Sequence, residues 1–184
     1  MSTAYAPVLA QREKLAAHLI KQLGLRRMAA SYCPTAQAAK AELLGLIPSP
    51  ASVIRCGSES VGGLGLWDDS SANALTLDGR LVNLDGTSNR VAGMLFGPRK
   101  VLLLVGMNKV VADLEAAYAR VRSIAAPANN IRLAGLGLKN PCIEDGRCHN
   151  CRSETRICNS WVVIEGSSVK DRIHVVLVGE DLGY

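Results

Sequence analysis

The first third of the chain alternates helical and strand patterns of apolar residues. Leucines recur at helical spacing over residues 7–27, with lysines and arginines between them, and predict an amphipathic helix. Short apolar runs at residues 28–33 and 52–56 predict two buried strands. A second helix is expected between them over residues 36–46, opened by Thr35 and ended before the prolines that follow. Strand, helix and strand in this order begin an alternating α/β fold.

The middle of the chain predicts a β-hairpin followed by a short helix. An Asp-Gly dipeptide lies between two segments of alternating apolar residues in the run LTLDGRLVNLDG, at residues 75–86. This pattern is a strong local signal for two antiparallel strands joined by a tight turn. Residues 87–97 then predict a short helix, with Thr87 or Ser88 as its N-cap.

The clearest strand comes next, over residues 100–108. Its five consecutive apolar residues predict burial on both faces, as in a central parallel strand. A helix is expected over residues 110–124, so residues 106–109 would form a turn at the carboxyl edge of a sheet, where open α/β folds collect their active sites. Residues 161–166 and 172–184 predict two final strands.

These elements fit one domain over residues 1–184, of the α/β class, with a mostly parallel sheet flanked by helices. Hydrophobic residues make up 48% of the chain and aromatic residues only 4%. The core must therefore be built from Leu, Val, Ile and Ala. No apolar run reaches the roughly 18 residues that a membrane span needs, and the N-terminus lacks a signal-peptide pattern. We therefore expect a cytoplasmic protein without a membrane span.

The formal net charge of +5 suggests an anionic partner. The basic residues are scattered and form no long stripe, and aromatic residues are too few to stack on bases, so we do not expect nucleic-acid binding. A small anionic substrate or an acidic redox partner protein fits this modest charge better.

A cysteine-rich loop over residues 139–160 carries the most specific chemistry. Its spacing is C-x5-C-x2-C-x6-C, and polar residues that offer no core fill the gaps. Four thiolates on a loop can converge on a soft metal centre without distorting a helix or strand. The candidate metal ligands are Cys142, Cys148, Cys151 and Cys158.

Three interpretations of this loop remain open. A [4Fe–4S] cluster takes four thiolates, and irregular spacing with one short C-x2-C step is common at such sites. Structural zinc also takes four thiolates, although its usual pattern has two C-x2-4-C pairs. The third interpretation is reduced or disulfide-paired cysteines with no metal. His149 is either a fifth donor or a solvated loop residue, and Cys33 and Cys56 are expected to be buried core thiols.

Polar residues after predicted strands are candidates for binding a small anion. Ser58 lies in a Gly-Ser-Glu-Ser turn whose N–H groups and hydroxyls suit an anion, or it is simply a solvated turn residue. The other candidates surround the second Asp-Gly turn and the turn after the apolar strand; each has an alternative as a capping or surface residue. They are Asn83, Asp85, Asn89, Arg90, Asn108 and Lys109.

Taken together, the runs LTLDGRLVNLDGTSNRVAGMLFG, PCIEDGRCHNCRSETRICN and RIHVVLVGEDLGY resemble the lactate-utilisation (LUD) domain family. More narrowly, they resemble its cysteine-bearing branch, formerly a domain of unknown function, over residues 73–184. The resemblance implies a three-layer α/β fold related to ribose-phosphate isomerases and CoA transferases. It also implies a role beside proteins that oxidise lactate to pyruvate, often encoded with iron–sulfur partners. The stretch at residues 61–72 is shorter than the family pattern.

We therefore expect an accessory or electron-transfer protein of 2-hydroxy-acid oxidation, with an iron–sulfur cluster on the four cysteines. Two alternatives stay open. One is a non-catalytic binding module with structural zinc, and the other is a small-anion enzyme of the isomerase or CoA-transferase type. The sequence contains no convincing pair of nucleophile and base, so it assigns no catalytic residue. A homo-oligomer is compatible with all of these alternatives.

Overall fold

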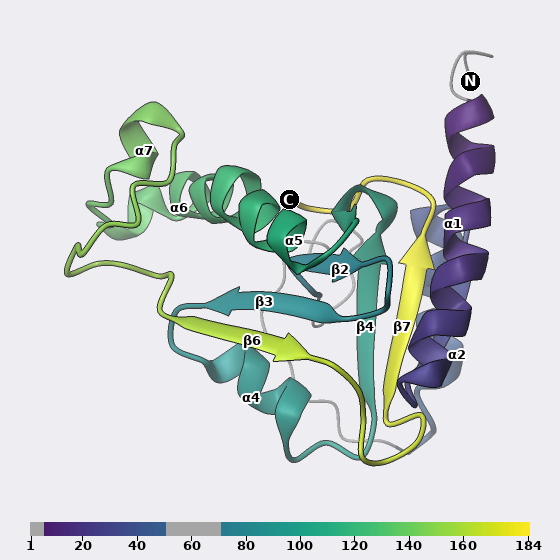
Figure 1. Cartoon of the computed structure of the whole chain (residues 1–184). Helices are drawn as coiled ribbons and strands as arrows, with labels where there is room; N and C mark the ends of the chain where they lie inside the picture. Colours follow the sequence, from purple (N-terminus) through teal and green to yellow (C-terminus); the bar gives the residue numbers. More distant parts are fainter. Residues whose placement is uncertain (1–5, 51–70) are drawn as a thin grey trace.

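The computed structural model describes residues 6–50 and 71–184 and has two sheets with helices packed on both (Figure 1). Ser58, Cys56, the expected strand at residues 52–56 and most of the short stretch at residues 61–72 lie outside the described residues. In chain order the elements are α1 (Ala6–Leu25), β1 (Ala29–Cys33), α2 (Ala36–Leu46), β2 (Ala74–Thr76), β3 (Leu81–Asp85), α4 (Asn89–Leu95), β4 (Val101–Gly106), the 3₁₀ turn η2 (Met107–Lys109), β5 (Val110–Val111), α5 (Leu114–Arg120), the π-helical segment η3 (Val121–Ala125), α6 (Ala126–Arg132), the 3₁₀ turn η4 (Ala134–Leu136), α7 (Cys142–Asp145), β6 (Ser160–Ile164) and β7 (Ile173–Val178).

The first sheet is parallel and has the strand order β1-β7-β4. Side chains alternate between its two faces, as strand geometry requires. Val175 and Leu177 of β7 belong to the core that includes Leu19 of α1. The residue between them, Val176, packs with Leu43 of α2 on the opposite face. Helices therefore cover both faces of the parallel sheet.

The second sheet is mixed and has the order β5-β2-β3-β6. The hairpin strands β2 and β3 are antiparallel, β6 pairs antiparallel with β3, and β5 pairs parallel with β2. Strands β2, β3 and β6 run crosswise to the direction of β4 in Figure 1. Leu81 faces the parallel sheet, and Val82 faces α5 and α6 on the outer side. Three of the five strand pairs in the two sheets are parallel.

These layers confirm the α/β class with helices on both sides of a sheet, and most of the predicted elements are present. The helix expected over residues 7–27 is α1, and the strand at residues 28–33 is β1. The helix over residues 36–46 is α2, and the Thr35 hydroxyl accepts a hydrogen bond from the Ala38 amide at 3.2 Å. The hairpin is β2 and β3, with Gly79 in the turn at a φ of 88°.

The helix predicted over residues 110–124 is wrong at both ends. Val110 and Val111 form strand β5 against β2, and the helix begins only after Asp113. The Asp113 carboxylate accepts a hydrogen bond from the Ala116 amide at 2.9 Å, which fixes the helix start there. The helical run then continues through η3 and α6 to Arg132. The apolar residues of strand β5 fit the same helical spacing as those of the helix that follows, so the sequence pattern did not separate the two elements.

Three smaller expectations also change. The helix after the hairpin is shorter than residues 87–97, and Ser88 is its N-cap by position but makes no side-chain capping bond. The two final strands lie in different sheets, β6 beside β3 and β7 between β1 and β4. In the described residues, the all-apolar strand β4 pairs only with β7, which is the central strand. No helix within residues 6–50 and 71–184 is both long and apolar enough to cross a membrane.

Candidate functional site

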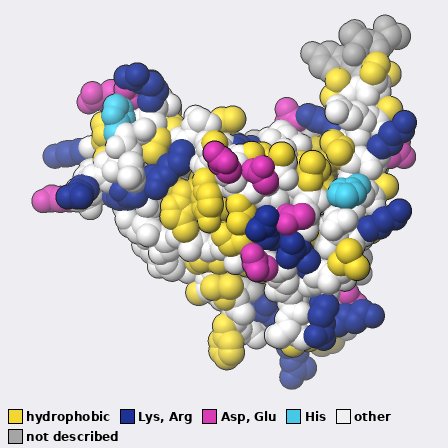
Figure 2. Space-filling model, viewed as in Figure 1, with side chains coloured by type: hydrophobic (Ala, Val, Ile, Leu, Met, Phe, Trp, Pro, Cys, Tyr) yellow, Lys and Arg dark blue, Asp and Glu magenta, His cyan; other side chains and the backbone are white. Residues whose placement is uncertain are grey.

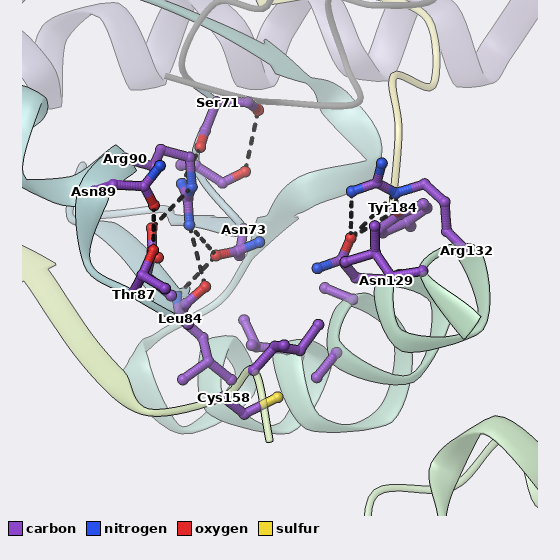
Figure 3. Close-up of a pocket in the computed structure, with 18 of the residues that line it drawn as sticks. Ser71, Asn73, Leu84, Thr87, Asn89, Arg90, Asn129, Arg132, Cys158 and Tyr184 are labelled. Carbon is purple, nitrogen blue, oxygen red and sulfur yellow. Dashed lines mark hydrogen bonds and ion pairs between the residues drawn. The ribbon is translucent and has the colours of Figure 1, made fainter. Parts of the chain in front are cut away.

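A cavity of about 280 Å³ lies between the turn after β3 and the long helical run α5–η3–α6 (Figure 3). Segments far apart in the sequence meet around it because β3, β4 and the chain's last residues converge there. Its described lining residues are Ser71, Ala72, Asn73, Leu84, Asp85, Gly86, Thr87, Asn89, Arg90, Lys109, Val121, Ala125, Ala126, Asn129, Arg132, Leu133, Ile157, Cys158 and Tyr184. The cavity is therefore polar at its walls and apolar over part of its floor.

The structure brings four of the seven anion-binding candidates to this cavity. Asp85, Asn89, Arg90 and Lys109 line it. Asn83 lies below the wall, fully buried, and accepts a hydrogen bond from Arg90. The remaining two candidates do not line it: Asn108 lies behind the turn, and Ser58 is outside the described residues.

Arg90 connects several residues of one cavity wall through its guanidinium group. Its Nη1 donates to the Ser71 carbonyl and to Asn83 Oδ1, each at 2.7 Å. Its Nη2 donates to Asn73 Oδ1 and to the Leu84 carbonyl, each at 3.1 Å. Its Nε lies 3.4 Å from the Asp85 carboxylate. The guanidinium thus directs its N–H groups to protein acceptors, and it orients this wall instead of offering a fork to a ligand.

Asp85 and Asn83 each keep one polar atom without a well-formed bond. Asp85 Oδ1 accepts from the Ser88 amide at 3.0 Å, but within residues 6–50 and 71–184 Oδ2 has only the ion pair with Arg90 and no hydrogen bond of good geometry. In the part of the chain that the structure describes, Asn83 Nδ2 is likewise buried without a hydrogen-bond acceptor. Such atoms are uncommon in native interiors and concentrate at functional sites.

Lys109 is a buried amine at the cavity wall. Only 3% of the residue is exposed, and its Nζ donates to the Ser71 hydroxyl at 3.1 Å. Burial, together with the positive charges of Arg120 and Arg90, lowers the pKa of Lys109 to about 7. An amine with this pKa is charged on part of the molecules at neutral pH, and an anion in the cavity would favour its charged form.

The opposite wall was not found by sequence reasoning. Arg132 Nε donates to the Tyr184 hydroxyl at 2.7 Å, and both side chains bond to Asn129 Oδ1 (Figure 3). Asn129 and Arg132 lie on a helical stretch that no local motif distinguishes from any solvated helix surface. Only the return of the chain's last residues toward α6 identifies them.

Asn108 holds that last segment in place. Its Oδ1 accepts from the Leu182 amide at 3.2 Å, and its Nδ2 donates to the Gly183 carbonyl at 3.1 Å. The interpretation of this asparagine as a helix cap is wrong, because the N-cap of α5 is Asp113, five residues later. Its contacts hold the chain's end, including Tyr184, at the cavity.

The cysteine loop forms a second, smaller cavity of about 20 Å³ beside α6. All four candidate ligands line it: Cys142, Cys148, Cys151 and Cys158. The four thiols are unpaired with any described cysteine. Burial raises the pKa of the Cys142 thiol, and the neighbouring cysteines add to the effect. Burial also raises the pKa of the Cys158 thiol. All four cysteines of the loop therefore lie along the same small cavity.

Buried amides anchor this loop to α6. Asn140 Nδ2 donates to Asn130 Oδ1 at 2.6 Å and to the Thr155 carbonyl at 3.0 Å. Asn130 Nδ2 in turn donates to the Ala126 carbonyl at 2.8 Å. Both asparagines are almost fully buried. These bonds join the segment before Cys142 and the segment between Cys151 and Cys158 to the same helix.

Hydrogen-bond donors point at two of the sulfurs. Cys148 Sγ accepts from Arg122 Nη1 at 3.6 Å and from the Asn150 amide at 3.5 Å. Cys158 Sγ accepts from Asn130 Nδ2 at 3.9 Å. N–H donors around thiolate sulfur are the surroundings that metal–thiolate centres use to stabilise and tune themselves.

The donor set therefore fits a thiolate-bound metal centre, but the sulfurs are not yet arranged around one. No three His, Cys, Asp or Glu side chains within the described ranges form a group that could hold a metal ion as they stand. A metal site is rarely preformed, so binding would have to draw the thiols together. His149 is half-exposed and its Nε2 bonds to the Asp145 carboxylate at 3.0 Å, as a solvated loop histidine would. On the face seen in Figure 2 the loop carries side chains of both charges.

The two cavities share a wall. Ala126, Ile157 and Cys158 line both of them. In Figure 3, Cys158 lies on the floor of the large cavity, between the Arg90 wall and the Arg132 wall. A group bound to the cysteines would therefore be a direct neighbour of a molecule in the large cavity.

Comparison with known proteins adds a family to this geometry. No curated protein matches the chain. A solved structure with a similar fold is that of a DUF162 family protein from Deinococcus radiodurans, at 14% sequence identity and a TM-score of 0.47, with 91% of this chain and 98% of that chain covered. The family model of the LUD domain matches residues 70–178, more than half of the chain. This match includes the described lining residues of both cavities except Tyr184, and the chain belongs to the LUD domain family.

Proposed function

We propose that this chain serves the oxidation of a small 2-hydroxy acid, with lactate as the first candidate, as an accessory or electron-transfer protein. Membership of the LUD domain family supports the substrate class. The observation that carries the proposal is that Cys158 lines both the polar cavity and the cysteine cavity. Substrate and redox centre would then be neighbours.

The large cavity is suited to a small carboxylate. Lys109 and Arg132 contribute a cation to each of two opposite walls. Charge-assisted bonds from such groups are the strong contacts available to a carboxylate. Ala125 and Leu84 provide an apolar surface for the methyl group of a lactate-sized acid. Arg90 supports this arrangement from behind by fixing the Asn73 side of the wall.

The four cysteines would hold the redox centre, which we propose to be a [4Fe–4S] cluster. When bound, such a cluster supplies a one-electron donor or acceptor. The chain's own part is to orient the thiols and to donate N–H groups to sulfur, as Arg122 and Asn150 do at Cys148. The cluster would also be shielded on the α6 side by the buried amides of Asn130 and Asn140.

Metal analysis and a visible spectrum of protein purified without oxygen test this proposal. We expect about four iron per chain and a band that bleaches with dithionite. Cys158→Ser should lose most of the iron, whereas Cys33→Ser, which removes a buried thiol of the parallel sheet, should retain it. Wild-type protein that is colourless and free of iron contradicts the proposal.

Ligand binding next to Cys158 gives a second test. Lactate or pyruvate should change the electron paramagnetic resonance spectrum of the dithionite-reduced protein, because the ligand would contact a cluster-bound residue. Acetate, which has a carboxylate but no oxygen on the adjacent carbon, is the control and should change the spectrum less. Identical spectra with and without either acid would show that the two cavities are not coupled.

Structural zinc is the second candidate, and the small volume of the cysteine cavity favours it. About 20 Å³ is room for one water-sized sphere, which suits a single ion better than a cluster. In this case the chain would be a binding module whose loop is ordered by zinc. One zinc per chain, with folding of the loop lost on chelation, would identify this alternative.

A further inference from the structure

Arg122 connects the mixed sheet to the cysteine loop. Its Nη1 donates to Cys148 Sγ at 3.6 Å, and its guanidinium carbon lies 5.4 Å from the centroid of the Trp161 ring. One nitrogen of the guanidinium therefore faces a sulfur, while its central carbon lies over an aromatic ring. Stacking on an aromatic face is a geometry that arginine adopts and lysine cannot reproduce.

The aromatic ring under Arg122 is itself held. Trp161 lies in β6, three residues after Cys158, and Tyr118 of α5 meets it edge to face at 4.7 Å and 83°. Such aromatic pairs contribute beyond their buried area. Tyr118 and Arg122 lie on the same helical run, and both contact the Trp161 ring. The ring therefore restricts where the guanidinium can lie. Arg122 is thus positioned before any metal binds.

The chemistry of this contact concerns charge at sulfur. Adding an electron to an iron–sulfur cluster increases the negative charge on its thiolates. Hydrogen bonds to sulfur and a nearby positive charge stabilise that reduced state, so both raise the reduction potential. Among the described residues, N–H donors contact the sulfurs of Cys148 and Cys158, and Arg122 is the only cation among these donors.

We infer that Arg122, held by Trp161, is a positioning residue that raises the reduction potential of the proposed cysteine-bound cluster through Cys148. This inference rests on the proposed function, because it requires iron at the four cysteines. The role assigned to Arg122 is distinct from metal ligation. Protein without Arg122 would still bind iron, but the reduced state of its cluster would be less stable.

Redox titration of anaerobic Arg122→Gln protein tests the inference. At a fixed potential near the wild-type midpoint, the ratio of oxidised to reduced cluster should rise about tenfold, which corresponds to about 59 mV for a one-electron couple. Iron content should match the wild type. R122K keeps the charge without the stacked fork and should recover part of the shift. A midpoint potential unchanged in R122Q at wild-type iron content overturns the inference.

Arg147→Gln is the matched control. Arg147 precedes Cys148 in the chain, but its side chain is 80% exposed and bonds to Asp145. Removing this screened charge should shift the potential much less than R122Q does. Equal shifts in the two variants would mean that only net charge matters, and they would overturn the role of the contact.

Trp161→Leu supplies a second route if R122Q fails to take up iron. It leaves the Arg122 charge in the chain but removes the ring that holds it, so the potential should shift in the same direction by a smaller amount. Potentials equal to wild type in both W161L and R122K overturn the inference. Wild-type protein without iron contradicts the proposed function itself, a result distinct from any of these.

Discussion

The environments of single residues at the large cavity cannot be predicted from their positions in the sequence. Lys109 is buried beside two guanidinium groups, those of Arg90 and Arg120, and the Asp85 carboxylate forms an ion pair with Arg90. Burying an ammonium group next to like charges is unfavourable, so the neutral amine is stabilised. The cavity wall therefore holds a cation whose charge depends on pH and on what occupies the cavity.

The pH dependence of stability should reveal this amine. Folding lowers the pKa of Lys109 from 10.5 to about 7, so between these values the unfolded chain binds more protons than the folded chain. Stability must then rise with pH across this window, and the penalty is fully present below about pH 7. Relative to Lys109→Met, the wild-type free energy of unfolding should rise by up to about 1.4 kcal/mol per pH unit.

Urea unfolding of both proteins at a series of pH values measures this difference. Comparing the two chains cancels the groups that titrate equally in both. The curves should run parallel below the window, where Lys109 is charged in both states, and converge or cross within it. Parallel curves throughout would mean that Lys109 keeps an ordinary pKa in the folded protein.

At the scale of elements, the hairpin turn is a point of close packing as well as a turn. Gly79 has a φ of 88°, and a Cβ placed there would lie 3.1 Å from the Gln22 carbonyl carbon and 3.2 Å from the Leu23 amide nitrogen. The Asp-Gly signal therefore serves two purposes. It closes the hairpin, and it lets the turn approach the backbone of α1, so the local pattern and the tertiary contact require the same residue.

Alanine at this turn should be more destabilising than alanine at a glycine with similar backbone but open space. Gly79→Ala should lower the free energy of unfolding by about 2 kcal/mol or more, from backbone strain together with the contacts against α1. Gly137→Ala is the control: its φ is 82° with nothing within 4 Å of the added Cβ, and about 1 kcal/mol of strain is expected. Chemical denaturation measures both variants. Equal losses in the free energy of unfolding would show that α1 can move away from the added Cβ without destabilising the protein.

At the scale of the whole molecule, Arg26, which directly follows α1, bonds to the hairpin turn between β2 and β3 and to the segment after β6. Its Nε donates to the Asp78 carbonyl at 2.6 Å, and its Nη2 pairs with the Asp78 carboxylate at 3.0 Å. Its Nη1 donates to the Glu165 carbonyl, just after β6, at 2.7 Å. One planar side chain thus joins the helix that covers the parallel sheet to two segments of the other sheet.

Replacing Arg26 should weaken the whole fold. Arg26→Met leaves two carbonyls without this donor and removes one partner of the Asp78 carboxylate, which keeps Arg80, and it should lower the free energy of unfolding by about 2 kcal/mol. Arg26→Lys should recover less than half of this, because an ammonium cannot reach three acceptors in a plane. Arg27→Met, at the exposed neighbouring position, is the control and should change stability by less than about 0.5 kcal/mol. A loss in R26M no greater than in R27M would contradict the role of Arg26.

Much of the fold was determined by the sequence alone, because the relevant signals are local. Helical spacing of leucines predicted α1, and the Asp-Gly dipeptide predicted the hairpin of β2 and β3. The four cysteines are also close in the chain, and all of them line one small cavity in the structure. Asp85 and Lys109 were candidates for the cavity because polar residues that follow a buried strand lie at a sheet edge.

The rest was decided by tertiary structure, because it depends on which surfaces meet. Val110 and Val111 fit a helical pattern as well as a strand, and only the open edge of β2 decides between them. Arg132 becomes a cavity residue because the chain's end returns across α6, and Arg90 becomes a wall support because five acceptors surround it. The shared position of Cys158 has the same origin: spacing along the chain places a sulfur beside other sulfurs, but only packing of the loop against α6 places it beside the second cavity.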